Sequence, residues 1–168
     1  MSNATSSEEL WLKISIADQS LCLLRGKNLL EVFDVSTASN GPGEQFGSEC
    51  TPRGWHKVRA KIGAGQPENA VFIGRRPTGE IYTPELNSDH PERDWILTRI
   101  LWLSGLEPGL NRLGNVDTMR RYIYIHGTPD DVELGVPNSH GCVRMHNCDI
   151  INLFDEVSVG ARVYIKAD

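Results

Sequence analysis

The segment NSHGCVRMHNCD, residues 138–149, holds two histidines, two cysteines, one arginine and one serine within twelve residues. Side chains of these types, placed so close together, could perform three kinds of chemistry. They could bind a zinc ion, form a disulfide bond, or supply the nucleophile and base of a covalent catalyst. The spacing of the residues favours some of these possibilities over others.

Zinc binding and disulfide formation both fit the spacing poorly. Structural zinc sites usually combine two close ligand pairs such as Cys-x2-Cys, whereas His140, Cys142, His146 and Cys148 all lie in one nine-residue segment with no second pair elsewhere. A disulfide between Cys142 and Cys148 would close a loop too small to stabilise the fold much. The four cysteines of the chain are therefore expected to be free thiols, and neither a metal nor another cofactor is expected.

Nucleophilic catalysis needs a base, because a thiol with a pKa near ~8.5 is only slightly ionised at neutral pH. His126 and His140 are the candidates: His140 lies two residues before Cys142, and His126 comes from a separate segment. Gly141 leaves room for the Cys142 backbone N–H, with the N–H before it, to face a substrate carbonyl as an oxyanion hole. On spacing alone, catalysis stands only slightly ahead of an alternative in which Cys142 is a small buried apolar residue and His126 an ordinary polar one.

The segments that must position these residues are mostly strands. Alternation of side-chain types predicts strands over residues 12–16, 58–62 and 121–127. A short apolar run bounded by prolines predicts another over 70–74, and a closing strand is expected over 161–165. The strand over 121–127 would end at His126. Residues 94–105 fit a buried helix or buried strands, and we favour strand.

The remaining segments are a hairpin, a loop and one helix. Residues 21–35 predict a hairpin that turns at Gly26 or Asn28, and the Gly- and Pro-rich residues 36–54 predict a long loop, either functional or a disordered insertion. A helix is expected over residues 149–157, with Asn147 or Asp149 as N-cap and Gly160 at its end. The fold class is thus mainly β, with a polar tail over residues 1–10 and a single domain over residues 11–168.

Composition and charge narrow the classes of partner. The net charge is −5 and the basic residues are scattered along the chain, so nucleic-acid binding is disfavoured. The chain has no apolar stretch of the ~20 residues that a bilayer span needs, and we expect no membrane contact. The first ten residues lack the basic start and apolar run of an export signal, which predicts a cytoplasmic protein, or a periplasmic one if a signal has been removed.

A family resemblance strengthens the catalytic hypothesis. The segment IHGTPDDVELGVPNSHGCVRM resembles the signature of the YkuD-type L,D-transpeptidase catalytic domain, in which a histidine precedes Ser/Thr-His-Gly-Cys by a dozen or so residues. Three further segments, WLKISIADQSLCLL, FDVSTASNGPG and TPRGWHKV, are similar to other parts of that family. The resemblance spans residues 11–165 and implies a β-sandwich with one or two short helices and a catalytic cleft.

The resemblance also implies a role for each residue of the site. Cys142 would be the nucleophile and His126 the general base, oriented by the backbone carbonyl of Gly127. Arg144 would bind a substrate carboxylate or brace the loop. Ser139 and His140 would shape the site, and the N–H groups of Gly141 and Cys142 would form the oxyanion hole.

The sequence leaves two features of the expected cleft undecided. The family often places a tyrosine in the cleft, and the sequence does not choose among Tyr82, Tyr122 and Tyr124. Residues 74–114, rich in charged residues and proline, could form a lid over the cleft.

The implied activity is cysteine-dependent acyl transfer on peptidoglycan stem tetrapeptides or muropeptides. The enzyme would cleave the L,D bond between residue three, typically diaminopimelate, and the terminal D-alanine. Given the expected cytoplasmic location, we favour hydrolysis, which is an L,D-carboxypeptidase activity in muropeptide recycling. The alternatives are a cross-linking L,D-transpeptidase, a non-catalytic module that binds cell-wall peptides, and a zinc-binding module. The sequence makes no prediction of oligomeric state.

Overall fold

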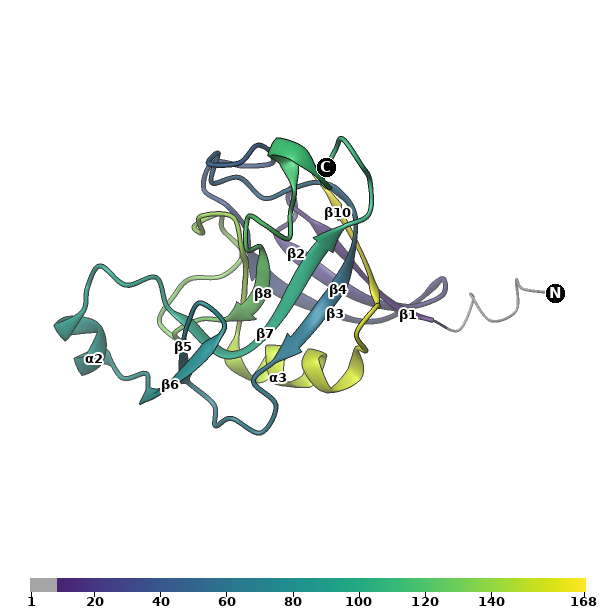
Figure 1. The fold of residues 1–168 in the computed structure, drawn as a ribbon. Coiled ribbons are helices and arrows are strands. Elements are labelled where there is room, and N and C mark those ends of the chain that lie inside the picture. The colour runs from purple at the N-terminus through teal and green to yellow at the C-terminus, as the bar shows by residue number, and fades with distance from the viewer. Residues whose placement is uncertain (1–8) are drawn as a thin grey trace.

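All the strands of the described residues belong to one sheet, and most of them close into a ring (Figure 1). In the computed structural model, which describes residues 9–168, the strand order is β4-β10-β1-β2-β3-β9-β8-β7-β5-β6, and β4 also pairs with β7. The strands are β1 (Leu10–Ser15), β2 (Ser20–Arg25), β3 (Asn28–Ser36), β4 (Gly54–Ile62), β5 (Ala70–Ile73), β6 (Arg76–Ile81), β7 (Ile96–Gly105), β8 (Tyr124–Gly127), β9 (Val143–Met145) and β10 (Arg162–Lys166). The helices of these residues are α2 (Pro84–Asp89), the 3-10 turn η1 (Gly114–Val116) and α3 (Asn147–Glu156).

The apolar alternation found in the sequence fills the interior of this closed sheet. Inward-facing residues of β1, β3, β7, β8, β9 and β10 form one buried cluster, and the apolar face of α3 packs onto it through Ile150, Leu153 and Phe154. Helix α3 contacts β7 and β8, so it lies beside the strand that carries His126. The hairpin of β5 and β6 extends the sheet beyond β7 and lies outside the closed ring.

The mainly β fold with two short helices is confirmed, and the two layers of the expected sandwich are joined by the β4–β7 pairing. The hairpin turns at Gly26, whose φ is 58°, and residues 96–105 form one strand. Strand β8 begins only at Tyr124, because backbone hydrogen bonds from Arg121 and Tyr122 close turns just before it.

The capping prediction for the last helix is wrong. Helix α3 begins at Asn147 with His146 as N-cap and no side-chain cap, because the Asn147 amide is buried and bonded to other segments. The helix ends at Glu156, and Gly160, with φ 94°, serves the turn that leads into β10.

The segment proposed as a lid, residues 74–114, is not a single insertion. It contains β6, α2 and all of β7, and β7 is a buried strand at the centre of the sheet. At most its first half, up to residue 95, could cover a cleft. Of the predicted tail, residues 1–8 lie outside the described part of the chain, and Leu10 already opens β1. None of the helices within residues 9–168 has the length and apolar character needed to span a bilayer.

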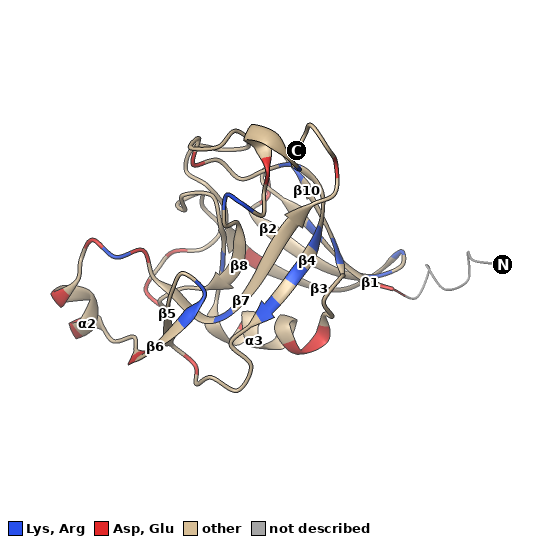
Figure 2. Ribbon diagram, viewed as in Figure 1, with Lys and Arg blue, Asp and Glu red and all other residues tan. Residues whose placement is uncertain are grey.

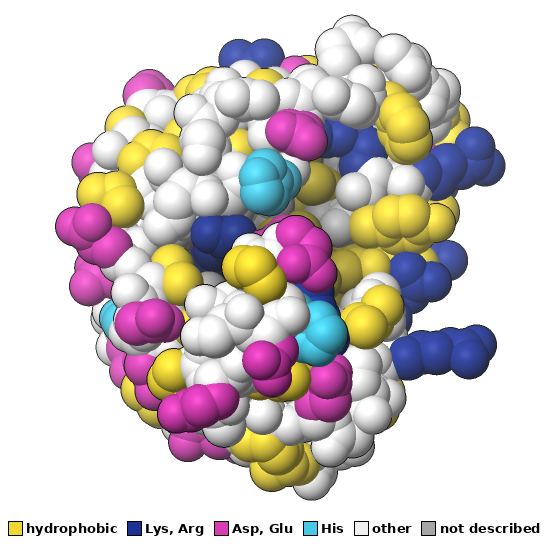
Figure 3. All heavy atoms as spheres, turned by 90° about the vertical axis from the view of Figure 1, so that its left-hand side faces the viewer, with side chains coloured by type: hydrophobic (Ala, Val, Ile, Leu, Met, Phe, Trp, Pro, Cys, Tyr) yellow, Lys and Arg dark blue, Asp and Glu magenta, His cyan; other side chains and the backbone are white. Residues whose placement is uncertain are grey.

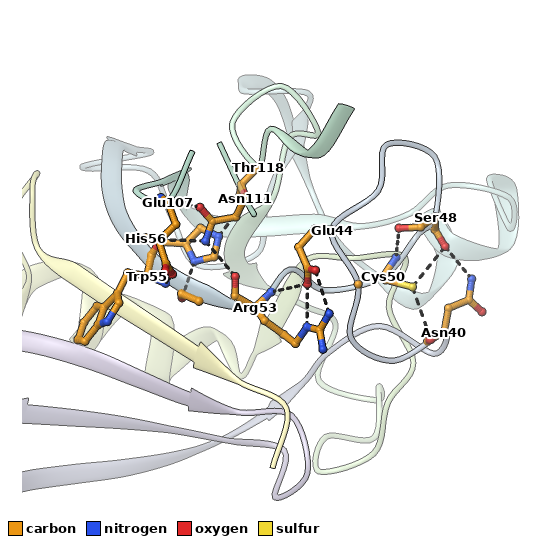
Figure 4. A network of polar contacts seen from close by, with 12 residues as sticks. Asn40, Glu44, Ser48, Cys50, Arg53, Trp55, His56, Glu107, Asn111 and Thr118 are labelled. Atoms are coloured by element: carbon orange, nitrogen blue, oxygen red, sulfur yellow. Dashed lines mark hydrogen bonds and ion pairs between the residues drawn. The ribbon is translucent and has the colours of Figure 1, made fainter. Parts of the chain in front are cut away.

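The long loop between β3 and β4 is held by its own polar contacts (Figure 4). Glu44 forms a bidentate ion pair with Arg53 at 2.9 Å. Near the start of β4, the buried ring of His56 bonds Thr118 Oγ1 at 2.9 Å. The loop is therefore an ordered part of the fold, which favours the functional interpretation over a disordered insertion.

Candidate active site

Cys142 and His126 lie on the same face of two neighbouring strands. Strands β8 and β9 run parallel, with Ile125 opposite Val143 and His126 opposite Arg144. Ile125 and Val143 are fully buried in the central core. Because side chains alternate along a strand, His126 points to the opposite, outer face, and Cys142, which immediately precedes β9, shares that face. The two residues are thus diagonal neighbours, a separation of roughly 7 Å between α-carbons.

The half-buried side chain of Cys142 places its thiol against β8 and the turn that precedes it. Its Sγ accepts a hydrogen bond from the Tyr124 N–H at 3.3 Å and donates to the Tyr122 carbonyl at 3.4 Å. Burial raises the pKa of Cys142 to about 12, against a smaller lowering by the Tyr124 N–H. The resting nucleophile is therefore a neutral thiol, and it needs a base when it reacts.

His126 is held in the form that can act as this base. Its side chain is 1% exposed, and Nδ1 lies 2.7 Å from the Gly127 carbonyl oxygen. A carbonyl only accepts hydrogen bonds, so Nδ1 carries the proton and Nε2 keeps its lone pair. Burial lowers the pKa of His126, with a smaller raising effect from the Gly127 contact. The structure records no hydrogen bond between His126 and Cys142, and such contacts often tighten only when substrate binds.

The turn before Cys142 is built by Ser139 and Thr51. Ser139 Oγ donates to the Cys142 carbonyl at 2.5 Å and accepts from the Gly141 N–H at 3.2 Å. Thr51, from the long loop, donates its hydroxyl to the Gly141 carbonyl at 2.9 Å. Gly141 has a φ of 130°, and a β-carbon there would lie 3.1 Å from Ile123 Cδ1, so glycine is required.

This turn changes the expected oxyanion hole. The N–H of Gly141 is already bonded to Ser139, so it is not a free donor as the sequence suggested. Among residues 9–168, the described hydrogen bonds of the turn do not use the N–H of Cys142. That N–H is the donor left for a substrate oxygen.

Arg144 is occupied by protein partners. Its guanidinium donates to the Asn138 carbonyl at 2.9 Å and to Asp94 Oδ1 at 2.8 Å. The other oxygen of Asp94 lies 3.7 Å from Nδ1 of His140, which is exposed. These contacts support the bracing role of Arg144 over direct binding of a substrate carboxylate. They also place Asp94, which the sequence interpretation missed, at the edge of the site.

The structure separates the three candidate tyrosines. Tyr122 and Tyr124 supply the backbone groups around the thiol, whereas Tyr82 packs against Trp95 in a different apolar cluster. Beside the thiol, the Arg75 guanidinium lies 4.3 Å from the Trp102 ring centre and donates to the Tyr124 hydroxyl at 3.1 Å.

An aromatic and cationic wall therefore borders Cys142. Figure 3 shows one face of the molecule on which hydrophobic side chains line a hollow beside histidines, with Lys and Arg gathered at its edge. Such a surface suits a ligand with both apolar and anionic groups.

Two further residues support the site from outside the predicted set. Arg121, half-buried, donates to the Cys50 carbonyl at 2.6 Å and holds the long loop next to the nucleophile turn. Its charge also lowers the pKa of Cys142 slightly against the effect of burial. Asn147, at the start of α3, bonds Thr98 and the Thr128 carbonyl just after His126.

The sequence gives only weak signals for these two residues. Arg121 is one of an Arg-Arg pair before a strand, and Asn147 resembles an ordinary cap.

The described residues offer no metal-binding group. Within residues 9–168 no set of three or more His, Cys, Asp or Glu side chains is arranged to hold a metal ion, and the four cysteines are free. The cysteines and histidines of residues 138–149 form no such set. Cys148 is exposed, and its recorded hydrogen bond within the described part of the chain goes to its neighbour Asp149.

Comparison with known proteins shows which family and fold the chain shares. The family model of the L,D-transpeptidase catalytic domain, YkuD, matches residues 9–165. A protein of Salmonella typhimurium named "Probable L,D-transpeptidase ErfK/SrfK" is 49% identical over 143 residues, which is 83% of this chain and 38% of that protein. "Probable L,D-transpeptidase YbiS" of Escherichia coli is 51% identical over 43 residues, 26% of this chain and 14% of that protein.

Solved structures share the fold. An L,D-transpeptidase from Mycobacterium smegmatis superposes with a TM-score of 0.56 at 20% identity, covering 95% of this chain and 59% of that one. The LD transpeptidase LdtMt1 in complex with imipenem gives a TM-score of 0.57 at 19% identity, covering 94% of this chain and 58% of that one. The chain thus spans well under two thirds of these proteins, and at such identities the likeness establishes the fold alone.

Proposed function

The chain belongs to the YkuD family of L,D-transpeptidase catalytic domains, and on this premise we propose that it is a cysteine acyltransferase acting on peptidoglycan stem peptides. The reaction would cleave the L,D bond between residue three of a tetrapeptide stem and the terminal D-alanine. One observation carries the proposal. A neutral buried imidazole, with Nδ1 committed to the Gly127 carbonyl, shares the outer face of adjacent strands with a glycine-flanked thiol.

The first half of the reaction forms a thioester. Nε2 of His126 takes the thiol proton as Sγ of Cys142 attacks the carbonyl carbon of residue three. Because burial keeps both groups neutral at rest, proton transfer accompanies the attack. The Cys142 N–H donates to the oxygen that becomes negative. The protonated His126 then gives its proton to the leaving amine, D-alanine departs, and the acyl group remains on sulfur.

The second half depends on the acceptor. Water would release a tripeptide, and the side-chain amine of another stem would form a cross-link. Hydrolysis is the outcome expected from the sequence and stays a prediction. Both matched relatives are named as probable L,D-transpeptidases, which favours an amine as the acceptor. Cross-linking is therefore the second candidate function.

The test is to incubate the protein with a disaccharide tetrapeptide and with the free tetrapeptide, followed by mass spectrometry. Tripeptide plus D-alanine supports hydrolysis, and dimeric products support cross-linking. Cys142→Ala should reduce turnover by on the order of 10³-fold or more. Cys148→Ala, which removes an exposed thiol of the same segment, is the matched control and should leave turnover unchanged. Turnover should also survive EDTA, because the steps use only a thiol and an imidazole.

A non-catalytic binding module would behave differently. It would bind the tetrapeptide without releasing D-alanine, and its intact mass would not change on exposure to a carbapenem. A covalent adduct that is lost in Cys142→Ala and kept in Cys148→Ala supports the acyltransferase. Equal turnover of wild type and Cys142→Ala would rule it out.

A further inference from the structure

A second cavity lies away from Cys142, on the outer face of β4 and β7. Its volume is about 200 Å³, and the connection from β7 to β8 forms its other wall. The polar residues that line it are Lys57, Arg59, Ser104, Arg112, Asp117 and Arg120. The proposed reaction uses none of them.

Positive charge exceeds negative charge around this cavity, because four cationic side chains and only one carboxylate, that of Asp117, line it. Within residues 9–168, Lys57, Arg59, Arg112 and Arg120 have no ion-pair partner among the recorded salt bridges. The one acidic residue, Asp117, already accepts the Leu113 N–H at 2.7 Å and the Arg120 N–H at 3.0 Å. Figure 2 shows Lys and Arg running along β4, although the chain as a whole carries a net charge of −5. Cations gathered in this way repel one another unless an anion lies between them.

A buried hydroxyl beneath the cavity is also without a partner. Ser104 lies opposite Lys57 in the β4–β7 ladder, and its neighbour Leu103 points into the core. Ser104 therefore points to the outer face, where it is 8% exposed and its Oγ has no hydrogen-bond partner within the described residues. Buried hydroxyls normally have a partner, so this one marks a place where a ligand oxygen would be stabilised.

We propose that this cavity binds an oxyanion, a phosphate or carboxylate group, at a site separate from the catalytic thiol. Lys57 and Arg120 provide charge-assisted hydrogen bonds from opposite walls, and Arg112 adds charge at the rim. The four cationic side chains are exposed, but a scatter of solvated surface cations would need neither a cavity between them nor an unpartnered hydroxyl below it. The proposal is independent of the reaction at Cys142, since it concerns binding alone.

Arg59 connects the cavity to the aromatic wall of the active site. Its guanidinium lies 5.3 Å from the centre of the Trp102 ring, which Arg75 approaches to 4.3 Å. Arg75 in turn bonds Tyr124, whose N–H contacts the thiol. A ligand that carries its oxyanion on a sugar could therefore extend along this wall, whereas a free ion would fill the cavity alone.

The test is to titrate each probe into the full chain at constant ionic strength, set with sodium chloride. Binding is measured by isothermal titration calorimetry and by amide chemical-shift changes in NMR spectra. The probes are inorganic phosphate, acetate and glucose 1-phosphate. We expect one site whose affinity for phosphate falls about tenfold in Lys57→Gln and again in Arg120→Gln, since each removes a charge-assisted bond. Ser104→Ala should weaken binding several-fold without lowering the thermal midpoint of the free protein.

The matched control is Lys27→Gln, which removes an equal charge from the exposed hairpin turn. It should bind phosphate as the wild type does, and it also corrects for the general stabilising effect of phosphate on folded proteins. Tighter binding of glucose 1-phosphate than of phosphate identifies a sugar-borne anion, and equal binding a free ion. Absence of saturable binding by all three probes, or affinity unchanged in Lys57→Gln and Arg120→Gln, would overturn the proposal.

Discussion

Acid should destabilise this fold well above the pH at which carboxylates titrate, and His56 is the main reason. The ring is fully buried on β4, where Nδ1–H donates to the Gly54 carbonyl at 3.0 Å and Nε2 accepts from the Thr118 hydroxyl at 2.9 Å. The acceptor role of Nε2 is possible only for the neutral ring, whereas Nδ1–H can donate in either protonation state. Burial lowers the pKa of His56 to about 4.

The size of the effect follows from proton linkage. The folded-state pKa lies below the unfolded-state value of 6.5, so the unfolded chain binds the proton first as pH falls. The stabilisation is therefore complete above pH 6.5 and is lost between about pH 6.5 and 4. Linkage gives a loss of about 2 kcal/mol in the free energy of unfolding by about pH 5, and about 3 kcal/mol once both states are protonated. Burial also lowers the pKa of His126, which acts in the same direction.

The assay is urea unfolding, monitored by tryptophan fluorescence, at a series of pH values from about 7.5 to 5. The His56→Gln variant should be less stable at neutral pH, and its free energy of unfolding should change clearly less with pH than that of the wild type. His140→Gln, at an exposed histidine, should keep the wild-type slope. If His56→Gln shows the wild-type pH dependence, the reasoning from burial is wrong.

Two substitutions near the nucleophile test the packing of the site. Gly141→Ala would place a β-carbon on a residue with a φ of 130° and against Ile123. It should lower the free energy of unfolding by about 1–3 kcal/mol and remove most of the activity. A variant with the urea midpoint and turnover of the wild type would contradict this. Asn147→Ala would leave the Thr98 hydroxyl and the Thr128 carbonyl without their buried partner and should cost about 2–4 kcal/mol in urea unfolding, whereas a change below about 0.5 kcal/mol would show that these bonds contribute little.

Local sequence patterns predicted much of this fold correctly, because the alternation of apolar and polar side chains identifies half-buried strands. The strands β1 and β10 form close to their expected bounds. Strand β4 also forms, but it begins at Gly54, four residues before the alternation that predicted it. The closure of β4 on β7 could not be predicted in this way. It joins His56 to Gly105 and Lys57 to Ser104, residues far apart in sequence, and no local pattern reports such a pairing.

The same distinction applies to the site. Cys142 and Gly141 lie in one short motif, which predicted a glycine-flanked thiol, but the bond from the Gly141 N–H to Ser139 was not foreseen. Arg144 instead depends on Asp94, fifty positions away, so its bracing contacts appear only once the chain is folded. Asn147 matched a cap by residue type, yet its side-chain amide bonds partners in three other segments, at Asn69, at Thr98 and at residues 128–130.

The position of β10 has a consequence for the order of assembly. This strand lies between β1 and β4 and pairs with both, although it is made more than a hundred residues after either. During synthesis from the N-terminus, β1 and β4 each keep one edge unpaired until the residues of β10 have left the ribosome. Exposed strand edges invite pairing with other chains. A nascent chain stalled before β10 would thus hold the complete catalytic motif but no closed sheet to support it.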